Sequence, residues 1–287
     1  MRKVGTKNDQ AALQVQFKYE RRMNALKRNT KLLRSKIMKN TLYNTLILLI
    51  LSQVIGCTSF NANSSSYQPT DEVVVLAHGL GRGETAMWRF AKKLESANYK
   101  VCRLDYSTIG KNVEKVIEQT NQQIDSCISK APKVHFVGHS LGGLVIRAYL
   151  QNNQEKLKSY NIGNAVFMGT PNKGSELADH LSESWVMKVG GEVSQSLITG
   201  DSSFGNTIEE VNIVMNINIG IIAGTKPSGL TKKHFDGPND GLVSVESTKL
   251  KSMKDFIAID VGHTAMRNND EVTKQTIYFL KNAVFKH

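Results

Sequence analysis

A serine between two glycines is the first feature of this sequence whose residue types and spacing could carry out chemistry. Residues 138–142 read Gly-His-Ser-Leu-Gly, which fits the Gly-x-Ser-x-Gly pattern of a nucleophile elbow. An elbow of this kind is a sharp strand-to-helix turn that holds the serine hydroxyl clear of a sheet, and glycines flank it because side chains would collide there. An apolar run precedes the pentapeptide and a helical pattern follows it. The pattern predicts that Ser140 is the nucleophile of an acyl transfer reaction.

An aspartate and a histidine follow at the positions that such a serine requires. Asp240 lies in a Gly- and Pro-rich loop, and His263 follows an apolar run near the C-terminus. The chain order Ser, Asp, His is typical of one class of serine enzymes and differs from the order in the others. We expect His263 to be the base and Asp240 the acid that orients it. Asp260 is the rival acid, but it lies only three residues before the histidine.

Acyl transfer also needs two N–H donors for the developing oxyanion. The N–H of Leu141, directly after the serine, is one predicted donor. The second is the N–H of Leu80, in a His-Gly-Leu-Gly loop at residues 78–81 that follows an early strand. His78 is expected to brace this loop rather than to transfer protons.

The elements that must position these residues alternate between short apolar runs and amphipathic stretches. This alternation predicts an α/β fold with a mostly parallel sheet flanked by helices. The stretch 172–218 fits the sheet poorly and is expected to be a small helical cap inserted between two strands. The strands are expected at 73–77, 100–104, 133–137, 165–168, 219–223 and 256–259, and the helices at 88–97, 113–128, 141–150 and 270–285.

These motifs together resemble those of bacterial triacylglycerol lipases and of the GPI-inositol-deacylase-like branch of the same superfamily. The resemblance rests on the elbow, the His-Gly-Leu-Gly loop, Gly169-Thr170-Pro171, the Asn-Asp-Gly-Leu-Val stretch at 239–243 and the late Gly-His pair. It covers the chain from Val73 to the C-terminus and implies the α/β-hydrolase fold, the same triad and the same oxyanion donors. Many such lipases bind calcium through an aspartate two residues after the histidine. Ala265 stands there in this chain, so no calcium is expected. No CxxC, HExxH or paired His/Cys spacing predicts another metal either.

The predicted reaction is hydrolysis of a carboxylic ester, with an acyl ester or lipid as substrate and no cofactor. Apolar residues of the predicted cap (Trp185, Val186, Met187 and Val189) favour an apolar acyl pocket. Two alternatives remain: an acyltransferase that passes the acyl group to another alcohol, and a non-catalytic lipoprotein that keeps the scaffold for binding. Cys102 and Cys127 either form a disulfide or remain separate thiols, because the sequence does not give their distance.

The net charge of +12 would suggest a nucleic-acid partner if it were spread over the chain. Residues 1–37, however, hold eleven Lys and Arg against two Asp and Glu, which accounts for +9. The remainder is nearly neutral and lacks a basic stripe, so nucleic acid is not the expected partner.

The N-terminal segment has the pattern of a targeting sequence. Residues 38–56 combine a short basic start with an apolar run of about a dozen residues, as in a signal peptide. The run ends at Val-Ile-Gly-Cys, which resembles a bacterial lipobox with Cys57 as the lipidated residue. Residues 57–70 are expected to be a flexible tether, and residues 71–287 the enzyme domain.

Residues 1–37 add nothing that a signal needs, so Met38 is a candidate true start. A long cytoplasmic tail on a signal anchor is the competing interpretation. With Thr58 in place of Asp, a Gram-negative host would sort the lipoprotein to the outer membrane, facing the periplasm.

Overall fold

A computed structural model describes residues 71–183, 190–208 and 216–287 of the chain, and its centre is a single parallel sheet. The sheet order is β2-β1-β3-β4-β5-β6, and every pairing between the described strands is parallel. Parallel neighbours need crossover connections, so each strand is followed by chain that returns over one face. The strands are β1 (Glu72–Ala77), β2 (Lys100–Arg103), β3 (Lys133–His139), β4 (Ile162–Met168), β5 (Ile219–Gly224) and β6 (Asp255–Ile259).

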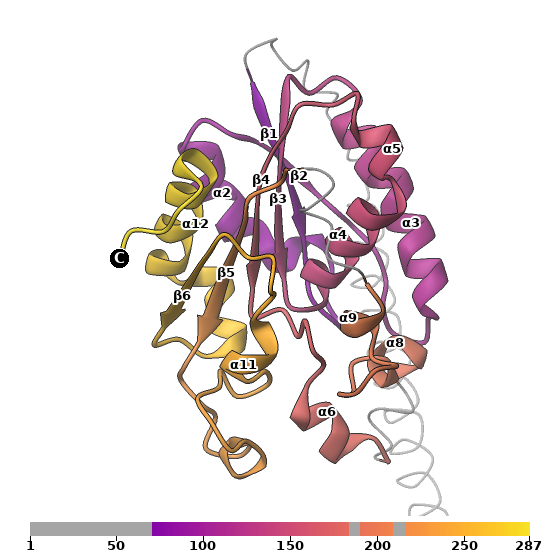
Figure 1. The fold of residues 1–287 in the computed structure, drawn as a ribbon, viewed down its shortest axis with the longest axis vertical. Helices are drawn as coiled ribbons and strands as arrows, with labels where there is room; N and C mark the ends of the chain where they lie inside the picture. Colours follow the sequence, from indigo (N-terminus) through magenta and orange to yellow (C-terminus); the bar gives the residue numbers. More distant parts are fainter. Residues whose placement is uncertain (1–70, 184–189, 209–215) are drawn as a thin grey trace, which may run out of the picture. The chain divides into compact units, whose positions relative to one another are not determined.

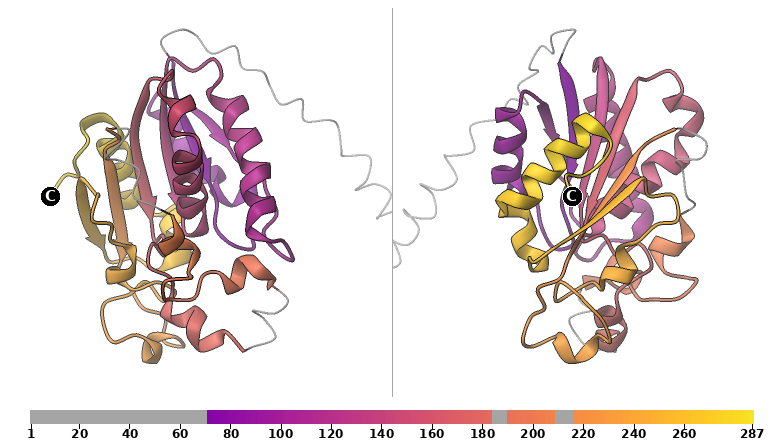
Figure 2. Two further views of the ribbon diagram at one scale, coloured as in Figure 1. Left: turned by 45° about the vertical axis from the view of Figure 1, so that its right-hand side comes forward. Right: turned by 60° about the vertical axis from the view of Figure 1, so that its left-hand side comes forward.

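Helices cover both faces of the sheet, as Figures 1 and 2 show. α2 and α12 pack on one face, while α3 and α4 pack on the other. Two of the long helices begin with an asparagine side chain that accepts a hydrogen bond from the first turn, Asn112 for α3 and Asn269 for α12. The α-helices are α2 (Trp88–Ser96), α3 (Val113–Ile128), α4 (Leu141–Asn152), α5 (Gln154–Leu157), α6 (Glu176–Leu181), α8 (Glu192–Gln195), α9 (Phe204–Thr207), α11 (Val245–Thr248) and α12 (Asp270–Asn282). The 3-10 helices are η1 (Glu84–Met87), η2 (Lys232–His234) and η3 (His263–Asn268).

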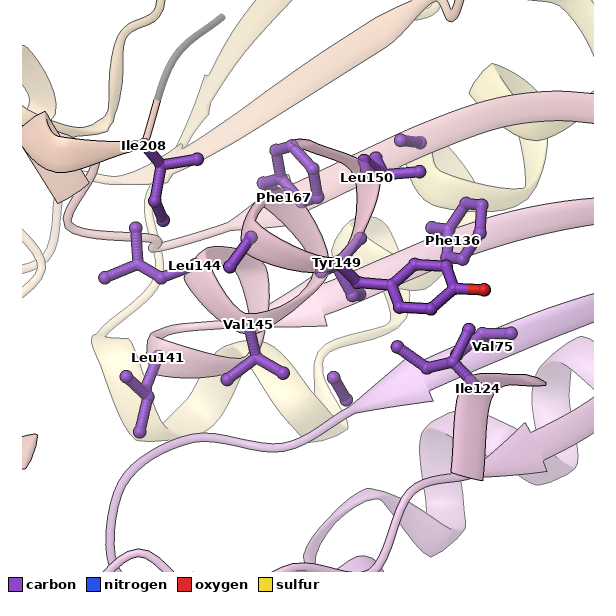
Figure 3. Packing of buried hydrophobic residues seen from close by; sticks show 14 of the residues in the cluster. Val75, Ile124, Phe136, Leu141, Leu144, Val145, Tyr149, Leu150, Phe167 and Ile208 are labelled. Atoms are coloured by element: carbon purple, nitrogen blue, oxygen red, sulfur yellow. The ribbon is translucent and has the colours of Figure 1, made fainter. Parts of the chain in front are cut away.

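The strands are apolar on both sides because both faces of the sheet are buried. Along β1, Val75 belongs to the cluster under α3 and α4, whereas Val74 and Leu76 belong to the cluster under α2 and α12. Figure 3 shows the first cluster, where Tyr149 of α4 lies beside Phe136 of β3. This packing fixes α4 against β3, and the turn between these two elements contains Ser140.

The predicted α/β architecture is confirmed, and most predicted elements match the structure within a few residues. The helix predicted over 113–128 is α3, with the same bounds. Between β4 and β5 the described helices α6, α8 and α9 are each only four to six residues long. The apolar residues 185–187 and 189, assigned above to an acyl pocket, lie outside the described residues. No helix within the described ranges is long and apolar enough to cross a membrane.

A disulfide joins Cys102 on edge strand β2 to Cys127 in the last turn of α3. The two Cα atoms are 6.0 Å apart, and the bond closes a sequence separation of 25 residues. The sequence left this pairing open because it depends on how α3 returns over the sheet. The disulfide fastens the edge strand to the helix that covers it.

Candidate active site

Ser140 lies in a strained turn between β3 and α4. Its backbone has φ 56° and ψ −129°, a region that non-glycine residues rarely adopt and that costs about 1–3 kcal/mol. The glycines around it are required by close backbone approach. A Cβ on Gly138 would lie 2.5 Å from the backbone of Gly143, and a Cβ on Gly142 would lie 2.5 Å from the carbonyl oxygen of Ala77. The surrounding packing thus holds Ser140 in the conformation of a nucleophile elbow.

Asp240 and His263 form a buried hydrogen-bonded pair. The distance from Asp240 Oδ2 to His263 Nδ1 is 2.7 Å, and the side chain of Asp240 is fully buried. The backbone N–H of His263 also donates to the carbonyl oxygen of Asp240, at 2.9 Å. Because Nδ1 is bound by the carboxylate, Nε2 is the ring nitrogen left for proton transfer.

Gly169, at the end of β4, makes room for this pair. It has φ +55°, and a Cβ there would lie 3.0 Å from Asp240 Oδ2 and 3.1 Å from His263 Nδ1. The first residue of the Gly169-Thr170-Pro171 motif therefore has a physical reason to be glycine. The pair is supported by backbone from β4 as well as by its own loops.

The His-Gly-Leu-Gly loop lies against the elbow. A Cβ on Gly79 would lie 3.0 Å from the Cβ of Ser140, so the two segments are in direct contact. His78 is buried, stacks on the ring of Tyr106 at 4.0 Å between centroids, and its carbonyl oxygen accepts a hydrogen bond from the Tyr106 hydroxyl. This arrangement suits the predicted bracing role of His78.

His139 packs under His263. Its Nε2 is 3.0 Å from the carbonyl oxygen of His263, and the two ring centroids are 4.8 Å apart. Burial holds the pKa of His139 well below its ordinary value, and the nearby His263 lowers this pKa further. The imidazole of His139 is therefore neutral at pH 7, and it steadies the histidine loop without adding charge.

Ser140 and His263 open onto a cavity of about 210 Å³. Leu80 of the His-Gly-Leu-Gly loop lines it, and Leu177, Ala178 and Leu197 from the chain between β4 and β5 form an apolar wall. An apolar cavity with a few polar groups at one end is the usual form of a small-molecule site.

Asp260, the rival acid, does not take part in the hydrogen bonding of His263. Asp260 is exposed and has no hydrogen bond with His263, unlike Asp240. Within the described ranges, no group of three or more His, Cys, Asp or Glu side chains is placed to hold a metal ion.

Sequence reasoning missed Arg82 and Arg267, which line the same cavity as Ser140. Neither arginine belongs to a motif, although Arg267 lies one helical turn after His263.

This chain is similar in sequence to several known proteins over part of its length. Residues 73–214 match the family model of palmitoyl protein thioesterase. A 2-hydroxy-6-oxononadienedioate/2-hydroxy-6-oxononatrienedioate hydrolase of Escherichia coli is 31% identical over 117 residues, which are 37% of this chain and 39% of that protein. Norfluorocurarine synthase 2 of Strychnos nux-vomica is 33% identical over 105 residues, 33% of this chain and 37% of that protein. The chain thus matches about two fifths of the length of these curated relatives.

Solved structures share the fold at low sequence identity. The mature Bacillus licheniformis lipase BlEst2 has a TM-score of 0.60 and 19% identity, covering 75% of this chain and 93% of that one. A metagenomic carboxyl esterase has a TM-score of 0.52 and 16% identity, covering 70% of this chain and 66% of that one. With its parallel sheet, its elbow and these matches, the chain has the α/β-hydrolase fold that it shares with these solved lipase and esterase structures.

Proposed function

We propose that this chain is a serine hydrolase that cleaves carboxylic esters through a Ser140–His263–Asp240 triad and an acyl-enzyme. One observation carries the proposal: a buried Asp240–His263 pair at 2.7 Å beside a cavity that the strained Ser140 also lines. A hydrogen-bonded acid and imidazole next to a serine on an elbow is the arrangement that activates a hydroxyl as a nucleophile.

The first half of the reaction forms the acyl-enzyme. Ser140 Oγ attacks the ester carbonyl carbon while His263 Nε2 takes the hydroxyl proton. The oxyanion accepts hydrogen bonds from the N–H groups of Leu80 and Leu141, the latter being the first residue of α4. His263 then returns the proton to the leaving alkoxide, and the alcohol departs.

The second half releases the acyl group. Water attacks the Ser140 ester, with His263 again taking the proton and then returning it to Ser140 Oγ. Asp240 stays ionised throughout and stabilises the imidazolium. If another alcohol enters in place of water, the same steps give an acyltransferase, so adding acceptor alcohols and measuring ester products separates the two outcomes.

The test of this proposal is Ser140→Ala. We expect wild type to hydrolyse nitrophenyl esters and to be labelled by a fluorophosphonate, and the variant to lose about 10⁶-fold in kcat, with no label. Ser159→Ala, a change of an exposed serine whose hydroxyl bonds only its own turn, is the matched control and should behave like wild type. Labelling that persists in Ser140→Ala would contradict the proposal, and so would an inactive wild type.

A second candidate is hydrolysis of acyl thioesters, which the match of residues 73–214 to palmitoyl protein thioesterase favours. Its chemistry uses the same groups, with a thiolate as the leaving group. Comparing kcat/KM for an oxygen ester and a thioester of the same acyl chain distinguishes the two. If kcat/KM is at least tenfold higher for one of the two substrates, the chain is assigned to that class, esterase or thioesterase.

A further inference from the structure

Two arginines line the cavity that contains Ser140 and His263. Arg82 follows the oxyanion loop directly, and Arg267 lies four residues after His263 on η3. They lie far apart in the sequence, so their meeting at the cavity is a property of the fold. Neither has a role in the reaction proposed above.

Arg267 is a buried cation with neutral partners only. The residue as a whole is 9% exposed, its Nε donates to the carbonyl oxygen of Thr264 at 3.3 Å, and its Nη1 donates to that of Ala86 at 3.1 Å. Among the described residues, neither Arg267 nor Arg82 forms an ion pair. Burial lowers the pKa of Arg267, and the positive charge of Arg82 lowers it further. The two guanidinium groups therefore repel each other.

Neither Asp240 nor His139 neutralises this charge. The carboxylate of Asp240 is bound to His263 and to the backbone of its own loop. His139 is close enough to feel the charge of both arginines, but it is neutral because burial lowers its pKa. A buried charge without a counterion is costly, and removal of that cost favours an anionic ligand.

We infer that Arg82 and Arg267 form an anion subsite in the substrate cavity, so that the preferred substrate is an ester carrying a carboxylate or phosphate. This inference rests on the proposed function, because it places the anion on the molecule that Ser140 attacks. Guanidinium groups bind both anions well, since their N–H groups match two oxygens at once. The anion can lie on the acyl part or on the alcohol part of the ester.

Paired substrates test the subsite on the full chain. For the acyl part, mono-4-nitrophenyl adipate is compared with 4-nitrophenyl hexanoate, which has the same chain length and no charge. For the alcohol part, dibutyryl phosphatidate is compared with dibutyrylglycerol. We expect kcat/KM to be at least tenfold higher for the anionic member of one pair, and that pair identifies where the anion lies.

Substitutions then connect the preference to the arginines. Arg82→Gln and Arg267→Gln should each reduce the ratio of anionic to neutral kcat/KM at least tenfold. Arg89→Gln, which removes an exposed arginine on α2 outside the cavity, should leave that ratio unchanged. If Arg267→Gln fails to fold because its two carbonyl partners are lost, Arg82→Gln still provides the test, since Arg82 is exposed.

Failure of the subsite is distinguishable from failure of the proposed reaction. If neutral esters are hydrolysed through Ser140 with no preference for either anionic partner, the subsite is wrong and the hydrolase proposal stands. If the arginine variants lower kcat/KM equally for the anionic and the neutral substrate of a pair, the arginines have a purely structural role and the subsite is wrong. If no ester is hydrolysed, calorimetric binding of monophenyl adipate and phenyl hexanoate decides: tighter binding of the anion supports the subsite, and equal binding overturns it.

Discussion

The two carboxylate oxygens of Asp240 have different partners, and this division determines what a substitution there would do. Oδ2 binds His263 Nδ1, while Oδ1 accepts from the backbone N–H groups of Leu242 and Val243, at 2.9 and 2.8 Å. In Asp240→Asn the amide oxygen would stay with the two N–H donors, so the NH₂ group would face Nδ1. The imidazole would then carry its proton on Nε2, which is the wrong tautomer for a base.

We therefore expect Asp240→Asn to fold normally and to lower kcat about 10⁴-fold at neutral pH. The measurement is steady-state hydrolysis of a nitrophenyl ester, with circular dichroism as a check of the fold. Asp260→Asn is the matched control, because Asp260 is exposed and unconnected to His263. A larger loss in Asp260→Asn than in Asp240→Asn would refute the assignment of the acid.

The sequence predicted the site residues that lie in motifs but not the two arginines that line the same cavity. Ser140, Asp240 and His263 stand in short patterns whose chain order is informative, and the structure places Asp240 against His263. Arg82 and Arg267 stand in no pattern. Their meeting depends on η3 turning back toward η1, where Arg267 reaches the carbonyl oxygen of Ala86. Such a contact joins residues 181 positions apart, which local sequence patterns do not encode.

The backbone at the end of β1 and the first turn of α4 approach so closely that Gly142 has no room for a side chain. A Cβ at Gly142, in the first turn of α4, would lie 2.5 Å from the carbonyl oxygen of Ala77 and 2.6 Å from that of His78. Both obstacles are backbone, so neither can rotate away. We expect Gly142→Ala to displace α4 and to lower the free energy of unfolding by about 3 kcal/mol, with loss of esterase activity.

Urea unfolding followed by circular dichroism measures this loss of stability. Gly237→Ala is the control, because a Cβ at Gly237 meets no atom within 4 Å and its backbone does not have positive φ. An unchanged unfolding midpoint in Gly142→Ala would show that β1 and α4 are not in such close contact.

The disulfide between β2 and α3 should stabilise the fold through the loop that it closes. For a separation of 25 residues, the loss of chain entropy in the unfolded state corresponds to about 3.5 kcal/mol. We expect the double substitution Cys102→Ala and Cys127→Ala to lower the urea midpoint, and dithiothreitol to lower the midpoint of wild type but not of the variant. Equal midpoints for oxidised and reduced wild type would argue against the bond.

Long periodic elements were predictable from the sequence, whereas single-turn elements were not. The apolar spacing of residues 113–128 defines α3, and the β-branched run at 73–75 defines the centre of β1. α11 and η3 are too short to be stable alone, so their apolar pattern carries little signal. They form because neighbouring loops hold them, as the carbonyl oxygen of Asp240 holds the start of η3.

For the molecule as a whole, we propose a lipid anchor at Cys57, which lies outside the described residues. The lipobox-like end of the apolar run and the Ser- and Asn-rich stretch after it support this proposal. A diacylated Cys57 at the mature N-terminus would hold the enzyme on a membrane, since two acyl chains give stable anchoring where one does not. We expect wild type in the membrane fraction, with the lipid on Cys57 seen by mass spectrometry.

Cys57→Ser should leave an unprocessed precursor, and Thr58→Ser, a conservative change beside it, should be processed like wild type. Normal processing and secretion of Cys57→Ser would refute the anchor. An unmodified N-terminus elsewhere in wild type would do the same. A Thr58→Asp variant reports on sorting, because in a Gram-negative host it should move the protein from the outer to the inner membrane.

The insertion point of the short helices between β4 and β5 has an evolutionary consequence. Ser140, Asp240 and His263 follow β3, β5 and β6, so none of them lies on the segment that contains α6, α8 and α9. That segment nevertheless supplies Leu177, Ala178 and Leu197 to the cavity wall. Insertions or deletions there would reshape the cavity and leave the spacing of Ser140, Asp240 and His263 intact. Descendants of this gene can therefore diverge in substrate by changing one segment in length, and selection can act on the wall and on the chemistry separately.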